Sequence, residues 1–303
     1  MERVATAHHQ SQLVRYMLKA EANTATAQVQ AATGLKSTDY KGIADDSGRL
    51  INLESYYRRS ERYVDEGEVV NGRIQAMHSA VGGMIDLTNR VEALVTSLQG
   101  AAGKGAEGIR SEAAALLEEF AALLNTQLEG RYLFAGAVTD RAPVSVNGTV
   151  YPPPPSPSSP DTGYYSGDGT IALFRASDDL ILEYGVTADN PAIEKALRAI
   201  NLLATMPTDP IDTDRVNEAA ELADAASDAL TVVQTRLGAT SATLERTIDR
   251  HLEEQLVLET RVDDVRAIDL AEAATRASQL RTSLEATLSL IRTLETTNLL
   301  KYL

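Results

Sequence analysis

The stretch LESYYRRSERYVDEGEVVNGRIQAMHSAVGGMIDLTNRVEALVTSL, residues 53–98, carries the clearest periodic signal in the chain. Apolar and small residues recur there at alternating intervals of four and three, which is the a/d spacing of a heptad repeat. The repeat positions are Tyr56, Ser60, Tyr63, Gly67, Val70, Ile74, Met77, Val81, Met84, Thr88, Val91, Val95 and Leu98. We therefore expect a long helix, ending near Gly100, with one stripe packed against a partner helix.

A second long amphipathic segment, residues 214–265, supplies that partner. Its stripe consists of Ala226, Leu230, Val233, Leu237, Thr240, Leu244, Ile248 and Leu252. At about 1.5 Å per residue such a helix spans on the order of 75 Å, so the pairing predicts a rod and not a globule. In the rod, Val70, Ile74, Met77 and Val81 are expected to face Leu230, Val233 and Leu237.

Between the two long patterns the chain changes character. A shorter helix is predicted after Gly100, with an apolar stripe of Ala113, Leu116, Leu117, Phe120, Leu123, Leu124 and Leu128. From about 131 to 190 the helical period disappears, and YPPPPSPSSP (151–160) reads as a polyproline-type loop. The runs GTIALFRA (169–176) and DDLILEYGV (178–186) predict two strands, with Asp178-Asp179 suited to a hairpin turn. Asn190-Pro191 then suits the start of a helix.

Both ends of the chain also read as amphipathic helices. The first 33 residues place Val4, Leu13, Met17 and Ala20 among polar residues, and the last 34 hold Leu280, Leu284, Leu288, Ile291 and Leu294. Isolated amphipathic helices are marginal in water, because packing provides most of their stability. We expect the two ends to be poorly ordered alone, and to pair as a coiled coil with each other and with neighbouring copies.

These patterns together predict a mainly α fold: a long antiparallel helical rod or coiled coil made from both chain halves, with a small β-rich outer insertion. The expected parts are a terminal coiled-coil assembly domain of residues 1–40 and 266–303, a helical rod domain of 41–130 and 191–265, and an outer domain of 131–190.

Composition excludes several classes of function. The 303 residues include 28 Lys and Arg against 43 Asp and Glu, a net charge of −15, whereas a nucleic-acid binder needs a basic face. The chain has no cysteine, which rules out disulfides and thiolate-bound metals. No apolar run approaches the roughly 18 residues that span a membrane. The opening MERVATAHHQSQLVRYML lacks the apolar core of a signal peptide, so any export is expected to bypass the ordinary secretory signal.

Catalytic motifs are weak. GAAGKG (100–105) lacks both the spacing and the Ser or Thr of a phosphate-binding loop, and it lies between predicted helices. His8 and His9 are adjacent and would diverge on a helix, while His78 and His251 are isolated on or beside a stripe and read as core or interface histidines. The pairs Asp45-Asp46, Asp178-Asp179 and Asp263-Asp264 have no partner base, ligand or nucleophile nearby in the pattern. We expect no enzyme activity, no cofactor and no metal site.

The nested arrangement resembles the bacterial flagellin family of axial proteins, and three stretches carry the likeness. Gly130-Arg131-Tyr132-Leu133-Phe134-Ala135-Gly136 is similar to the G-x-Y-L-F-A-G motif of the family's hook–filament junction branch, hook-associated protein 3. QVQAATGLKSTDYKGIADDSGRL (28–50) resembles the family's q-x-A-T-G-l-k-i segment followed by a polar loop. NLLKYL (298–303) and YYSGDGTIALF (164–174) also resemble the junction branch. The first residues, MERVATAHHQ, depart from the family's usual start.

The resemblance implies a structural adapter between hook and filament, exported by the flagellar type III apparatus to an extracellular flagellum. The partners it implies are copies of the same chain, hook-associated protein 1, flagellin, and a cytoplasmic export chaperone at the C-terminal helix. The assembly face would include Leu13, Met17, Leu280, Leu284, Leu288, Ile291 and Leu294. A minor flagellin within the filament is the alternative, and an unrelated intracellular coiled-coil scaffold or small-molecule binding module is a third reading.

Residues 130–136, called the central motif below, also have a physical interpretation of their own. The motif residues are Gly130, Tyr132, Leu133, Phe134 and Gly136. The large side chains are expected to plug the end of the rod where the outgoing helix gives way to β structure, each contributing roughly 1.5–3 kcal/mol when fully buried. The flanking glycines permit backbone turns that other residues resist. An ordinary core strand is the alternative.

Overall fold

The computed structural model describes the main chain of residues 2–100 and 105–299, and the side chains of residues 11–100 and 105–293. The helices are α1 (Glu2–Thr33), α2 (Ser47–Gly100), α3 (Ala106–Leu124), α4 (Pro191–Ala204), α5 (Thr213–Arg266) and α6 (Leu270–Leu299), with a short 3₁₀ helix η1 (Tyr40–Ile43). The strands are β1 (Gln127–Leu128), β2 (Arg131–Tyr132), β3 (Ala172–Arg175) and β4 (Ile181–Tyr184). The predicted mainly α class is confirmed.

The chain divides into two compact units. The first, called the terminal unit, comprises Met1–Arg59 and Glu254–Leu303, and the second, the central unit, comprises Ser60–Glu253. Helices α2 and α5 contribute residues to both units. Each unit is thus built from both halves of the chain, as expected, while the three-part division of the sequence stays a prediction.

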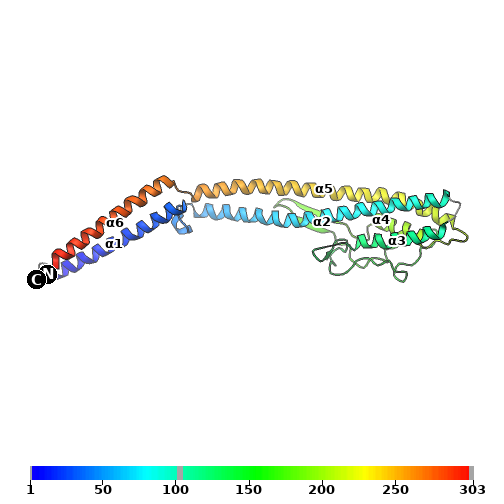
Figure 1. Cartoon of the computed structure of the whole chain (residues 1–303), viewed down its shortest axis with the longest axis horizontal. Coiled ribbons are helices and arrows are strands. Elements are labelled where there is room, and N and C mark those ends of the chain that lie inside the picture. Colours follow the sequence, from blue (N-terminus) through cyan, green and yellow to red (C-terminus); the bar gives the residue numbers. More distant parts are fainter. Residues whose placement is uncertain (1, 101–104, 300–303) are drawn as a thin grey trace. The chain divides into compact units, whose positions relative to one another are not determined.

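In the central unit α2 and α5 lie side by side and antiparallel (Figure 1). Polar side chains mark the register: Asn71 Oδ1 accepts from Ser241 Oγ at 2.6 Å, and Ser227 Oγ donates to Asn89 Oδ1 at 2.8 Å. Near the end of α2, Gln99 Nε2 donates to Asn217 at 3.2 Å. As α2 advances, its partners on α5 therefore move steadily toward lower numbers.

The seam between these helices is the predicted a/d stripe. From Val70 to Leu98 every predicted α2 position is buried, and Ile74, Val81, Met84, Thr88 and Val91 are fully inaccessible. Each fully buried aliphatic side chain contributes about 1.5–3 kcal/mol. Two predicted positions are wrong. Tyr56 is 55% exposed. Leu252 is 46% exposed, because buried His251 takes the next α5 position along the seam.

A second face of α2 is buried as well, which the heptad pattern did not predict. Ala80, Leu87 and Leu94, each seven residues apart, lie in the same core as α3 and α4. A Cβ on Gly83 would stand 3.1 Å from Leu123 Cδ1 of α3, so this glycine permits close approach. The hydrophobic core of the central unit is therefore a layered bundle and not a single pair of helices.

Helices α3 and α4 form where the sequence placed them. The predicted stripe of α3 is buried from Ala113 to Leu124, apart from half-buried Leu123. The assignment of Leu128 to this helix is wrong: α3 ends at Leu124, and Leu128 lies half-buried on β1. Helix α4 begins at Pro191, with Asn190 Oδ1 accepting from Ala192 N at 2.9 Å as the predicted cap.

The segment between α3 and α4 contains two antiparallel hairpins, β1–β2 and β3–β4, joined by irregular loops. The predicted strands at 169–176 and 178–186 are β3 and β4, with Phe174 opposite Leu182. Phe174 and Tyr184 turn inward, while Leu173 and Ile181 face outward. Asp178 lies in the connecting turn, where its carbonyl accepts from Arg175 Nη1 at 3.1 Å.

Truncation of a seam isoleucine to alanine tests how much the seam contributes to stability. Ile74→Ala should lower the free energy of unfolding by about 2–5 kcal/mol, because the cavity opens in a fully buried position. The matched control Val69→Ala, on the same helix but 41% exposed, should change it by less than about 0.5 kcal/mol. Denaturant unfolding followed by circular dichroism measures both, and equal losses would contradict the seam as the core.

Candidate functional site

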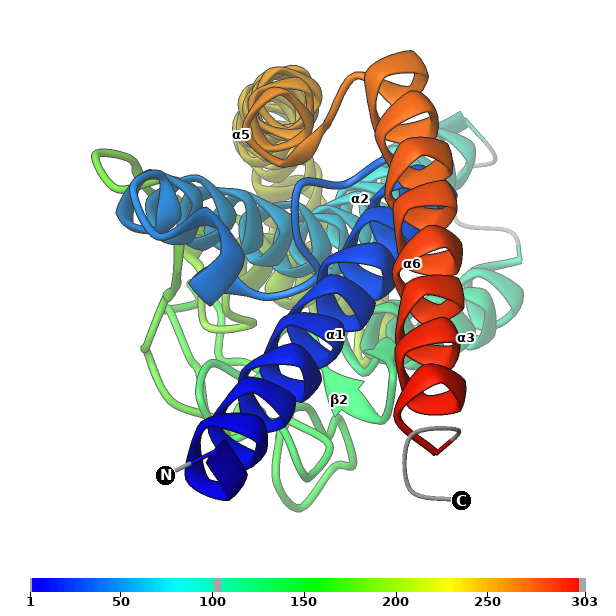
Figure 2. The same cartoon turned by 90° about the vertical axis from the view of Figure 1, so that its left-hand side faces the viewer.

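The terminal unit pairs α1 with α6, and the two helices lie side by side in both views (Figures 1 and 2). On each helix the less exposed residues recur at intervals of four and three, which is a heptad seam. The seam residues are Leu13, Met17, Ala20, Thr24, Ala27 and Ala31 on α1, and Ala273, Ala277, Leu280, Leu284, Thr287 and Ile291 on α6. Thr24 Oγ1 reaches Leu280 O at 3.4 Å. The predicted pairing of the two chain ends is confirmed.

A compact linker joins these helices to α2 and α5 within the same unit. Gly34, at φ +71°, ends α1. The carbonyl of Gly34 accepts from Ile268 N at 2.9 Å, and Lys36 N donates to Arg266 O at 2.7 Å. Asp39 caps η1 through Gly42 N at 2.9 Å. The ATGLKS stretch therefore works as a turn that ties the outgoing and returning chains together.

The predicted assembly residues fall into three groups. Leu13, Met17, Leu280, Leu284 and Ile291 lie half-buried in the α1–α6 seam. Leu288 is off the seam and 40% exposed. The side chain of Leu294 lies outside the described residues, as do those of Val4, His8 and His9.

A second apolar stripe on α1 was missed by the sequence reasoning. Its residues, called the α1 stripe, are Val14, Leu18, Ala22, Ala25 and Val29, all exposed. Val14 is 50% exposed, Leu18 55% and Val29 47%. On α6, Leu290 is 65% exposed. The available signal was the recurrence of these apolar residues every three or four positions, each one or two positions after a seam residue. Such a stripe exceeds what a lone helix pair needs.

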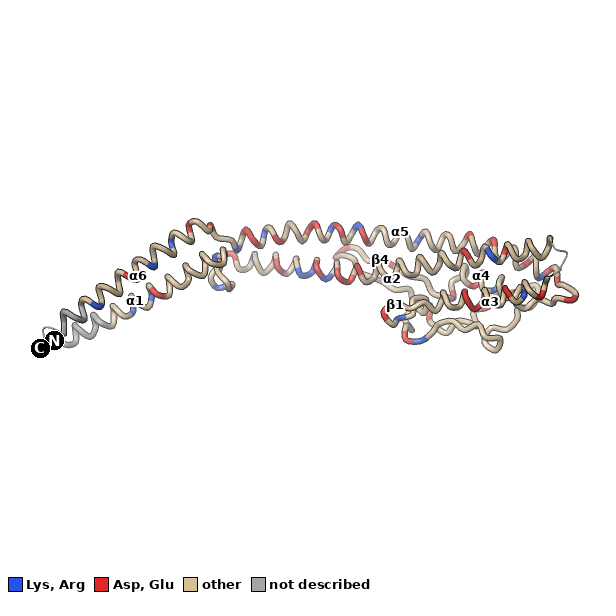
Figure 3. The backbone as a smooth tube through the Cα atoms, in the orientation of Figure 1, with Lys and Arg blue, Asp and Glu red and all other residues tan. Residues whose placement is uncertain are grey.

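The two units differ in charge. The terminal unit holds 14 Lys and Arg and 14 Asp and Glu, so it is neutral. The central unit holds 14 Lys and Arg and 29 Asp and Glu, and carries the whole net charge of −15. Asp and Glu residues recur along α3 and along α5 (Figure 3). Copies of the chain would therefore repel one another through the central unit and not through the terminal unit.

The central motif begins with a tight hairpin. Leu128 pairs with Arg131, which leaves Glu129 and Gly130 as a two-residue loop. Both have positive φ, +53° and +75°, the backbone that a type I′ hairpin turn requires. The turn reverses the chain directly after α3 and delivers Tyr132 half-buried, Leu133 at 9% exposure and Phe134 fully buried. Helix α3 thus gives way to the β1–β2 hairpin just before these residues, while the plugging role of their large side chains stays a prediction.

The main chain of the motif organises the loops around it. Phe134 O accepts from Ala188 N at 3.0 Å, and Ala135 O accepts from Asp168 N at 3.2 Å. Asp168 Oδ1 in turn accepts from Ala137 N at 2.7 Å and Thr170 N at 3.1 Å. These backbone donors lower the pKa of the Asp168 carboxyl. A Cβ on Gly136, at φ +69°, would lie 2.3 Å from Asp168 O, so only glycine fits there.

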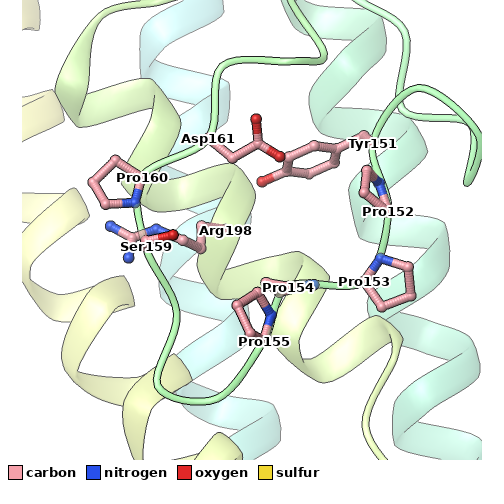
Figure 4. Close-up of a pocket in the computed structure, with 9 residues that line it drawn as sticks. All are labelled: Tyr151, Pro152, Pro153, Pro154, Pro155, Ser159, Pro160, Asp161 and Arg198. Carbon is pink, nitrogen blue, oxygen red and sulfur yellow. The ribbon is translucent and has the colours of Figure 1, made fainter.

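The Pro-rich loop 151–160 is anchored, although its sequence indicated no packed core. Pro152 O accepts from Asn201 Nδ2 at 3.1 Å, and Pro154 O from Arg215 Nη2 at 2.6 Å. Beneath it, Arg198 Nε lies 2.9 Å from Glu194 Oε1, with both side chains nearly buried. Arg198 and Asp161 line a cavity of about 200 Å³ together with the prolines (Figure 4). Glu194 Oε1 also accepts from Asp161 N at 3.1 Å, and Arg198 Nη1 donates to Ser158 Oγ at 3.0 Å, so the ion pair holds the loop in place.

Two tyrosines complete this anchor. Tyr151 and Tyr164 are buried, with their rings edge to face and centroids 5.2 Å apart. Tyr164 Oη donates to Ala188 O at 2.8 Å. Burial, together with the nearby Glu194 carboxylate, raises the pKa of both phenols. No local sequence pattern indicated this network, because it joins separate loops that meet only in the folded chain.

The histidine interpretation is confirmed for His251. Its ring is buried and stacks on Tyr63 with centroids 5.2 Å apart, and Nε2 lies 2.9 Å from Ala176 O. Among the residues whose placement is described, no group of His, Cys, Asp and Glu could hold a metal ion. In the same residues, no helix has the length and apolar character that crossing a membrane requires.

Comparison with known proteins gives a consistent picture. Residues 4–139 match the bacterial flagellin N-terminal helical region, and residues 220–303 match the bacterial flagellin C-terminal helical region. No curated protein sequence matches the chain.

Two solved structures share the fold, and a third is a weaker match. FlgL from Bacillus cereus is 15% identical with a TM-score of 0.56, and the match covers 71% of this chain and 99% of that one. A putative flagellar hook-associated protein from Vibrio parahaemolyticus is 16% identical with a TM-score of 0.58, covering 76% and 99%. Flagellar hook associated protein-3 from Legionella pneumophila is 13% identical with a TM-score of 0.32, covering 83% and 99%.

Two glycine substitutions test the contribution of the central motif to stability. Gly136→Ala should lower the free energy of unfolding by about 2–5 kcal/mol, since it adds left-handed strain and a clash with the Asp168 main chain. Gly130→Ala has similar φ but nothing within 4 Å of the new Cβ, so only about 1–2 kcal/mol should be lost. Chemical denaturation compares the two, and a smaller loss at Gly136 would contradict the assigned role.

Alkaline titration tests the tyrosine anchor. The folded pKa of Tyr151 and Tyr164 is raised above the unfolded value near 10. Their contribution to stability is therefore complete below about pH 10 and is lost as pH rises through the folded values. Tyrosinate absorbance should rise in two phases, the second coinciding with unfolding by circular dichroism. Tyr151→Phe should reduce the second phase alone, and a reduction of the first would count against burial.

Proposed function

The chain belongs to the bacterial flagellin family, and from this premise we propose that it is the adapter that joins hook to filament. The family assignment makes it a structural, non-enzymatic component of the extracellular flagellum that assembles with other flagellar components. The observation that carries the finer role is the fold. It accommodates 99% of the length of two hook-associated chains, the FlgL and Vibrio structures, at TM-scores above 0.5. The GRYLFAG motif and the NLLKYL ending support the same branch.

The terminal unit suits the role of assembly domain. Its intramolecular seam already uses Leu13, Met17, Leu280, Leu284 and Ile291, which sets the α1–α6 pair as a single building block. The α1 stripe, with Leu288 and Leu290 on α6, then remains for neighbouring copies. Burying a leucine there would contribute roughly 1.5–3 kcal/mol per contact. Electrical neutrality of this unit removes a repulsive barrier to close packing.

The partners of the adapter follow from the same proposal. Copies of the chain would form a ring, with hook-associated protein 1 on one side and flagellin on the other. Before export through the flagellar type III apparatus, a cytoplasmic chaperone would cover the apolar face of α6, including Leu288 and the segment around Leu294. Masking this face would keep subunits apart, because an exposed apolar helix associates with any similar surface.

Cells lacking this chain test the adapter role. We expect bare hooks by electron microscopy and abundant flagellin in the medium, because the filament would have no base on which to grow. Filaments of normal number and anchorage would overturn the proposal and favour the minor flagellin. Low copy number per flagellum is expected for an adapter, whereas a filament subunit would be abundant.

Complementation separates the assembly face from the fold. Leu18→Asp places an unpaired charge in the proposed contact, at a cost of several kcal/mol if it is buried, and should leave hooks bare. The purified variant should keep the wild-type helix content, since Leu18 is 55% exposed. Leu173→Asp, equally polar and 68% exposed on β3, is the matched control and should restore filaments. Full rescue by Leu18→Asp would contradict the assigned face.

A further inference from the structure

The chain contains two Asn-Gly dipeptides, Asn71-Gly72 and Asn147-Gly148, in opposite surroundings. Asparagine followed by glycine can lose its side-chain amide when the next main-chain nitrogen attacks it. We propose that Asn147-Gly148 is a self-modifying site of this kind, and that the fold protects Asn71-Gly72. The inference stands on the local geometry and does not depend on the proposed function.

The turn at Asn147 prepares the side-chain carbonyl for attack. Asn147 Oδ1 accepts from Thr149 N at 3.2 Å and from Val150 N at 2.9 Å. Two N–H donors aimed at this oxygen would stabilise the negative charge that it gains as the carbon becomes tetrahedral, as in an oxyanion hole. The donors are main-chain groups of an ordered turn, so they need no rearrangement during the reaction.

The attacking nitrogen is unobstructed. Gly148 is exposed, and a Cβ placed on it would meet nothing within 4 Å. Within the described part of the chain, no hydrogen bond is formed by Gly148 N. On the departing side, Asn147 Nδ2 donates to Ser145 Oγ at 3.0 Å. The Ser145 hydroxyl is therefore within reach of the nitrogen that must take up a proton as it leaves.

The reaction balances without an outside oxidant or reductant. A base removes the proton of Gly148 N, and this nitrogen forms a bond to Cγ of Asn147. The Cγ–Nδ2 bond then breaks, and the nitrogen leaves as ammonia after gaining a proton. The product is a five-membered cyclic imide. Water opens the imide at either carbonyl, which gives an aspartate or an isoaspartate at position 147.

The second dipeptide differs in its main-chain conformation and in the state of its attacking nitrogen. Asn71 lies inside α2, where Nδ2 donates to Glu245 Oε1 at 3.0 Å and Oδ1 accepts from Ser241 Oγ at 2.6 Å. Main-chain N–H groups within a helix donate to carbonyls four residues back, which occupies Gly72 N. Closing the imide ring would require breaking helical hydrogen bonds beside Val70 and Ile74, which are buried in the core.

The modification would act on the Pro-rich loop. Asn147 O accepts from Val150 N at 2.9 Å and from Tyr151 N at 2.8 Å. An isoaspartate lengthens the main chain by one methylene at this point, and either product adds one negative charge to the already acidic central unit. The modification would therefore alter the hydrogen bonds that anchor the Pro-rich loop at Tyr151.

Peptide mapping by mass spectrometry tests the proposal on the full chain. After incubation at 37 °C and mildly alkaline pH, the peptide containing Asn147 should gain the mass of an amide-to-acid change. Its rate should exceed that of the Asn71 peptide on the order of tenfold or more, which corresponds to about 1.4 kcal/mol in barrier height. The rate at Asn147 should also rise with pH, because the attacking nitrogen must lose its proton.

Two controls keep the outcome decisive. Gly148→Val should abolish the gain at Asn147 by hindering the attack, with the melting temperature unchanged because the side chain points into open space. In denaturant the wild-type rates at the two sites should converge, which assigns the native difference to the fold. Equal native rates at the two dipeptides, or no gain at Asn147, would overturn the inference.

Discussion

The antiparallel packing of α2 on α5 is the interaction on which the rest of the structure depends. Its register is fixed by polar pairs such as Asn71–Ser241 and Asn89–Ser227, which place the stretch of α2 between the two asparagines alongside the stretch of α5 between the two serines. Because two distant segments of the chain must run side by side, everything between them has to turn back, and both termini belong to one unit. The nested order of the fold is thus a consequence of one long hydrophobic seam.

The second buried face of α2 explains why the middle of the chain folds at all. A segment with two hairpins of two and four residues per strand cannot form an independent core. It is ordered because Phe134, Tyr164 and Phe174 are buried in the core to which α2, α3 and α4 also contribute. The main chain of the central motif then positions the surrounding loops through the carbonyls of Phe134 and Ala135. The motif is best understood as a junction where turn geometry and core packing coincide.

Much of this fold could be predicted from the sequence, and the exceptions have physical reasons. Strong periodicity located α2, α3 and α5, and the Asn190-Pro191 cap located α4. The seam left its predicted course at His251 because a buried polar group with good partners competes with a nearby leucine. Pairings such as Asn201 with Pro152, or Tyr151 with Tyr164, depend on tertiary contacts that no local pattern encodes. The α1 stripe was overlooked because its residues, mostly alanine and valine, are weak markers of a face.

The two units differ more in their net charge than in the way their helices pack. A neutral terminal unit and a central unit with all 15 excess negative charges respond differently to crowding of identical copies. At physiological salt, charges are screened beyond about 8 Å, so repulsion between central units acts only when copies are already close. This repulsion would disfavour contact between the acidic surfaces of neighbouring copies. The apolar α1 stripe would then be the surface through which association costs the least free energy. Under the proposed assembly role, specificity for one mode of association would arise as much from what the acidic unit disfavours as from what the stripe attracts.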